Sequence, residues 1–122
     1  MDIEKLEILR AIAEMAYVIA IADKGLSAAE RIAFNTIIEE ELSYESWAAQ
    51  SRFELLDEII QPDLASAYKE AIHDFTKYKL HLTNELKQTA VRVMMRVAHA
   101  CSGFSEKESL ILDRFKKDIE HL

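Results

Sequence analysis

Two carboxylates bracket a short loop near the N-terminus, Asp23 and Glu30, and their spacing suits a bound cation. Calcium and similar hard ions take several oxygens at once from carboxylates and loop carbonyls. Asp23 ends one expected helix and Glu30 lies in the first turn of the next, so both side chains can face the loop. Glu30 also completes the pattern Ser27-x-x-Glu, which is typical of a capping box at a helix start. A weak divalent-cation site and a purely structural cap are therefore both open.

A second group of carboxylates forms the densest acidic run of the chain, and it is a candidate surface for a basic protein partner. The run comprises Glu39, Glu40, Glu41 and Glu45. Its first three members lie near the end of an expected helix, where negative charge opposes the helix dipole unless a cation is near. A charge run is also commonly no more than a solvated face. Partner binding and plain solvation are the two interpretations.

His99 and Cys101 are the candidate residues for nucleophilic or soft-metal chemistry, and they lie two residues apart near the end of an expected helix. Residues two apart point to different sides of a helix. A zinc-type site needs about four ligands, and a nucleophile needs a base and an orienting group. Neither set is identifiable in the sequence, so we expect no catalytic residue, no enzymatic activity and no organic cofactor.

Composition and net charge limit the classes of protein to which this chain can belong. The chain has 122 residues, half of them hydrophobic, with two glycines and one proline, which predicts a single all-α domain over residues 1–122. The net charge of −7 argues against nucleic-acid binding. A single cysteine and the absence of a basic leader predict a cytoplasmic protein. The apolar run 11–22 is too short for a membrane span.

Apolar periodicity predicts about six helices that pack as a bundle. In the third of them, the side chains expected to face the core are Trp47, Phe53, Leu56, Ile59 and Ile60. The expected helices cover residues 2–23, 27–41, 44–60, 63–75, 84–101 and 105–122.

Glu14 interrupts an otherwise apolar helix that other helices must enclose. A lone buried carboxylate is costly, so it needs a basic partner. We expect Glu14 to pair with a cation such as Arg92.

The segment 22–30 recurs in looser form at 100–108, with a constant offset of 78 residues. Each copy has an apolar helix, a glycine break and a Ser-x-x-Glu start of a new helix. This pattern predicts two related helix–loop–helix units, at about 2–42 and 84–122, bridged by helices at about 44–80.

The two loops resemble those of the tellurite-resistance TerB-like family, which has an all-α fold built from two such units. The resemblance implies a bacterial stress-response protein whose acidic loops bind a divalent cation such as Ca²⁺. Cys101 stands where the second loop of that family is expected to be acidic. Only Asp23, Glu30 and Glu108 carry the cation-binding role over to this chain. The matching residues are Ala22, Asp23, Gly25, Leu26, Ser27 and Glu30, then Ala100, Gly103, Phe104, Ser105 and Glu108.

Together these observations predict a non-enzymatic, acidic interaction module of a stress-response system, with weak cation binding at the Asp23–Glu30 loop. The alternative is a metal-independent adaptor or immunity-like protein. Such an adaptor would present the acidic face Glu39–Glu45 to a basic protein partner.

Overall fold

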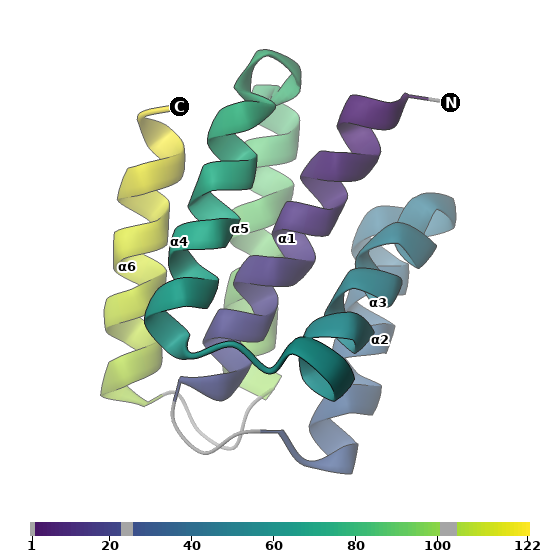
Figure 1. Ribbon diagram of the computed structural model, residues 1–122, viewed down its shortest axis with the longest axis vertical. Coiled ribbons are helices and arrows are strands. Elements are labelled where there is room, and N and C mark those ends of the chain that lie inside the picture. Colours follow the sequence, from purple (N-terminus) through teal and green to yellow (C-terminus); the bar gives the residue numbers. More distant parts are fainter. Residues whose placement is uncertain (1, 23–25, 101–104) are drawn as a thin grey trace.

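Every regular element in the described chain is a helix or a helical turn (Figure 1). The computed structural model describes residues 2–22, 26–100 and 105–122. The predicted all-α class is confirmed for these ranges, whereas Gly25, Gly103 and Cys101 lie outside them. The helices are α1 (Ile3–Ile21), α2 (Ala28–Leu42), α3 (Ser46–Leu55), α4 (Leu64–Lys77), α5 (Asn84–Ala100) and α6 (Glu106–Glu120), with short turns η1 (Ser43–Glu45), η2 (Leu56–Ile60) and η3 (Lys79–His81).

The first helix, α1, is the central element of the bundle. It packs against α4, α3 and α5, and in Figure 1 it runs between the α4–α5 side and the α2–α3 side. Its residues 11–20 are all buried, as its nearly uniform apolar character predicts. The second helix packs against α3 and α5, and α6 packs mainly against α5. Within the described ranges, no helix is both long enough and apolar enough to cross a bilayer.

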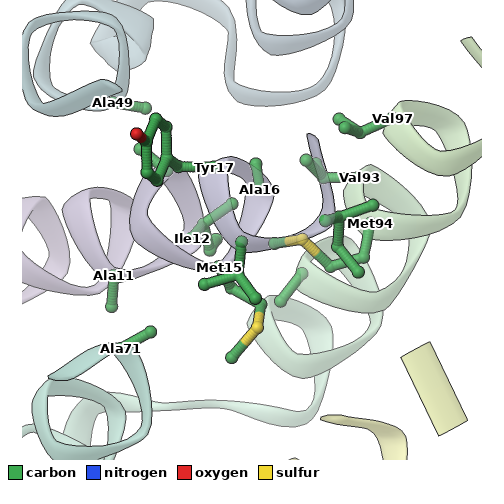
Figure 2. Close-up of a cluster of buried hydrophobic side chains, with 14 of the residues drawn as sticks. Ala11, Ile12, Met15, Ala16, Tyr17, Ala49, Ala71, Val93, Met94 and Val97 are labelled. Atoms are coloured by element: carbon green, nitrogen blue, oxygen red, sulfur yellow. The ribbon is translucent and has the colours of Figure 1, made fainter. Parts of the chain in front are cut away.

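Small side chains set how closely the neighbours of α1 approach it. Ala11 lies beside Ala71 of α4, and Ala49 of α3 lies beside Tyr17 (Figure 2). All three alanines are completely buried. A larger side chain at these contacts would push the helices apart, because protein interiors are close-packed.

Replacing Ala71 with leucine is expected to lower the free energy of unfolding by about 1–3 kcal/mol, since added methylenes overpack a filled core. Urea denaturation checks this value. The matched control is Ala65→Leu, because Ala65 lies on the same helix but is exposed. Equal stability of the two variants would show that the α1–α4 contact tolerates expansion.

Both predicted capping boxes are present. The backbone N–H of Glu30 donates to Ser27 Oγ at 3.1 Å, and the N–H of Ser27 donates to Glu30 Oε1 at 2.9 Å. Ser105 and Glu108 exchange the same two hydrogen bonds, at 3.1 and 3.3 Å. The prediction of a structural role for both Ser-x-x-Glu motifs is therefore confirmed.

The third predicted helix differs from the expectation of one regular helix over 44–60. It divides into η1, α3 and a π-helical turn, η2, which the N–H of Gln61 closes by donating to the carbonyl of Leu56 at 2.8 Å. The wider turn changes the helical period, and it leaves Ile59 and Ile60 74% and 54% exposed. Their predicted inward orientation is wrong. The same holds for Trp47, which is 45% exposed beneath the guanidinium of Arg10.

Candidate functional site

A groove of about 440 Å³ runs between α2 and the α3–η2 segment, and it gathers more carboxylates than cations. Its walls come from helical positions three or four residues apart, which share one face of each helix. The lining residues are Arg31, Asn35 and Glu39 from α2, and Gln50, Phe53, Glu54, Asp57 and Glu58 from α3 and η2.

The floor of the groove is aromatic and well packed. Phe53 stacks on Phe34 with ring centroids 3.7 Å apart, and the rings of Phe53 and Tyr17 lie nearly perpendicular with centroids 5.8 Å apart. Phe53 is 5% exposed and Phe34 is 2% exposed. These contacts join α1, α2 and α3, so the polar walls of the groove stand on a rigid base.

One ion pair closes part of the groove. Arg31 donates from Nε and Nη2 to the two carboxylate oxygens of Asp57, at 2.6 and 3.1 Å. This bidentate contact raises the pKa of Arg31. Gln50 donates to Glu39 Oε1 at 3.2 Å, which holds that carboxylate at the wall.

Negative charge predominates in the groove because Glu54 and Glu58 are exposed and neither forms an ion pair with a described residue. The lining has four carboxylates and a single guanidinium, so three negative charges are left unbalanced. A groove with this charge and an aromatic floor suits a basic segment that also carries apolar side chains.

The acidic run predicted as a partner surface is largely engaged within the protein. Glu41 accepts from Arg92 Nε at 2.7 Å and from Arg96 Nη1 at 3.2 Å, and Glu40 accepts from Arg96 Nη2. Burial opposes the ionised form of Glu41, but these hydrogen bonds outweigh it and lower the pKa. The two arginines of α5 thus supply the cations that the carboxylates at the end of α2 require.

The remaining two residues of the run lie apart from each other. Glu45 forms an ion pair with Lys5 Nζ at 2.8 Å, near the start of α1. Of the four residues of the acidic run, Glu39 is the one that lines the α2–α3 groove. The run is therefore not one surface, and its role in binding a partner stays a prediction.

The residues predicted to bind a cation have other contacts or lie outside the described chain. Asp23 belongs to the undescribed ranges. Glu30 serves the capping box of α2, and Glu108 serves that of α6 while being only 2% exposed. Cys101 also lies outside the described residues.

A different group of metal-ligand side chains comes together at the other end of α1. Ligand atoms of Asp2, Glu4 and His81 lie within 4.8 Å of one another, because η3 packs against α1. This is the one such group in the described part of the chain. Asp2 already caps α1 by accepting from the N–H of Lys5 at 3.1 Å. His81 is 77 residues away from Glu4 in the sequence, so helix spacing gave no signal of this cluster.

Glu14 is buried and paired with a cation, as expected, but the predicted partner is wrong. Arg52 Nη1 of α3 lies 2.9 Å from Glu14 Oε2, whereas Arg92 binds Glu41. Helix α3 packs along α1 and brings Arg52 to this position. Arg92 lies 78 residues after Glu14, which is the offset of the repeated loops, but this offset does not determine which helix covers Glu14.

Comparison of the chain with protein-family models, with curated proteins and with solved structures finds no match. The resemblance to the TerB-like family therefore stays a prediction based on the two loop motifs.

Proposed function

We propose that this chain is a non-enzymatic protein-binding adaptor, and that its α2–α3 groove binds a basic segment of a partner. The supporting observation is the groove itself: four carboxylates and one guanidinium surround an aromatic floor. No bound metal is needed for this function, so it corresponds to the metal-independent adaptor considered in the sequence analysis. The proposed binding surface is now the groove and not the Glu39–Glu45 run.

The partner's chemistry follows from the walls and the floor. Arginine is the best match, because its planar guanidinium can bind a carboxylate through two hydrogen bonds. Exposed Glu54 and Glu58 lie one helical turn apart, so two basic side chains at a similar spacing can each find a carboxylate. Flanking apolar residues of the partner would pack toward Phe53.

The assignment of the chain to the TerB-like family is also part of this proposal. Two capping boxes at the predicted separation support two related helix–loop–helix units within a six-helix, TerB-like bundle. Membership in a bacterial stress-response system rests on the resemblance alone, whereas a cytoplasmic location and cation binding at the Asp23–Glu30 loop rest also on the residues of the sequence.

Charge reversal at the groove should weaken binding of a basic partner. We expect the double variant Glu54→Lys/Glu58→Lys to bind a labelled peptide of alternating arginine and leucine at least tenfold more weakly than the parent chain. Both side chains are exposed, so the fold should tolerate the change. Fluorescence anisotropy at low and at physiological ionic strength measures the affinity, which should fall with salt.

The control variant Glu85→Lys/Asp113→Lys changes the net charge equally at exposed positions outside the groove. It should lose little affinity. If both double variants lose affinity to the same extent, the peptide responds only to net charge and the groove is not a binding site.

A further inference from the structure

A second, smaller cavity of about 190 Å³ lies between α1, η2 and α4, and it is separate from the α2–α3 groove. Two of its lining residues, Ser66 and Glu70, are exposed, so the cavity reaches the surface of α4. A dry cavity of roughly 150 Å³ is large enough to hold benzene, so this one can hold a small organic group. The lining residues are Glu14, Leu56, Ile60, Pro62, Ser66, Ala67 and Glu70.

The buried carboxyl group of Glu14 is the unusual feature of this cavity. Glu14 is 4% exposed, and Arg52 binds its Oε2 at 2.9 Å. Its Oε1 accepts no hydrogen bond from the residues that the structure describes. When Glu14 is ionised, this oxygen is a buried acceptor without a donor, and either a proton shared with the Asp74 carboxyl or a donor from a ligand satisfies it.

Negative charge exceeds positive charge around Glu14. Asp74 of α4 lies within hydrogen-bonding reach of the Glu14 carboxyl, and Glu70, one turn earlier on α4, lines the cavity. Arg52 of α3 is the cation paired with this group, and the η2 residues Leu56 and Ile60 are apolar.

The balance of these contacts favours a proton on Glu14 at neutral pH. Burial raises the pKa of Glu14 to about 8, and the Asp74 carboxyl adds to the shift, while Arg52 opposes it. A second cation that reaches Glu14 can take the place of that proton.

The shape and lining of the cavity indicate the kind of cation. Among described residues, the one group with three ligand atoms close enough for a single metal ion is Asp2, Glu4 and His81, so the carboxylates around Glu14 do not converge in this way. The cavity wall is instead aliphatic, from Leu56, Ile60, Pro62 and Ala67.

We propose that this cavity binds a primary ammonium group on a short aliphatic stem. The ammonium group donates to Glu14 Oε1, which lacks a donor, and it neutralises the excess negative charge that Glu70 and Asp74 contribute. The stem packs on the aliphatic wall. This chemistry is shared by free alkylamines and by a lysine side chain, and the site does not depend on the α2–α3 groove.

Isothermal titration with n-butylammonium chloride tests the proposal directly. We expect millimolar binding at pH 7 with release of a proton, measured from the dependence of the heat on the buffer. The affinity should rise roughly tenfold per pH unit between pH 6 and 7 and level off above pH 8, because the ligand displaces a proton from Glu14. Nα-acetyl-lysine methylamide, titrated in parallel, distinguishes a lysine side chain from a free alkylamine by which of the two binds more tightly.

Two variants locate the binding in the cavity. Glu14→Gln keeps an oxygen that can accept from Arg52 but removes the negative charge, and it should lower the affinity at pH 8 at least tenfold. Ser66→Leu leaves Glu14 intact and narrows the opening, and it should also weaken binding. The matched control Glu106→Gln removes an exposed carboxylate that lines neither the cavity nor the α2–α3 groove, and it should bind normally.

Three results would overturn the proposal. The first is no binding of n-butylammonium well above millimolar concentration. The second is equal binding of uncharged n-butanol, which would show that the ammonium group is not recognised. The third is unchanged affinity in both Glu14→Gln and Ser66→Leu, which would place the binding elsewhere.

Discussion

Glu14→Gln is expected to stabilise the protein at alkaline pH by a few kcal/mol and to have little effect near pH 5. The pKa of Glu14 is about 8 in the folded protein, against an ordinary value of 4.5. Between these values the folded state holds a proton that the unfolded chain releases. The free energy of unfolding of the parent chain therefore falls as pH rises through this window, by about 1.4 kcal/mol per pH unit at most.

A neutral amide at position 14 removes this dependence, because it has no proton to lose and can still accept from Arg52. Urea denaturation from pH 5 to pH 9 measures the slope in each protein. Glu54→Gln is the control and should keep the slope of the parent chain, since Glu54 is exposed. An unchanged slope in Glu14→Gln would mean that Glu14 ionises normally in the folded protein.

Phe53→Ala is expected to lower the free energy of unfolding by about 3–5 kcal/mol, the cost typical of truncating a buried phenylalanine. Phe53 is 5% exposed and contacts both Phe34 and Tyr17, so its loss leaves a cavity where α1, α2 and α3 meet. Urea denaturation of the variant measures the loss.

Tyr44→Ala provides the comparison, because Tyr44 is 90% exposed and its removal should change stability by less than about 0.5 kcal/mol. A loss below about 1 kcal/mol in Phe53→Ala would mean that the three helices collapse onto the vacated space. The floor of the groove would then be adaptable instead of rigid.

The sequence predicted best those features that depend on neighbouring residues. The capping boxes of α2 and α6 involve partners three residues apart, so local spacing is sufficient to identify them. The burial of α1 was also predictable, because a helix that is apolar on all sides has to be enclosed.

Features that depend on which helices pack together were not predicted. Arg52 reaches Glu14 only because α3 lies along α1, and nothing in the spacing of 38 residues indicates this. The exposure of Ile59 and Ile60 follows from the π-helical turn, whereas a regular helical period places them inward.

The acidic groove was missed because its two walls are distant in sequence. Glu39 was noted as part of an acidic run, but the run divides among contacts with α3, α5 and Lys5. The pair Glu54 and Glu58, one turn apart on the polar side of the third helix, was the available signal. This pair lines a groove only because α2 lies opposite it, and that packing is visible only in the structure.

We expect the α2–α3 groove to bind a basic segment, and amide chemical shifts followed during titration with the arginine–leucine peptide locate the binding site. The largest shifts should fall within residues 31–39 and 50–58, with little change along α5 and α6. Shifts concentrated on α5 and α6, or spread evenly over the acidic surface, would contradict it.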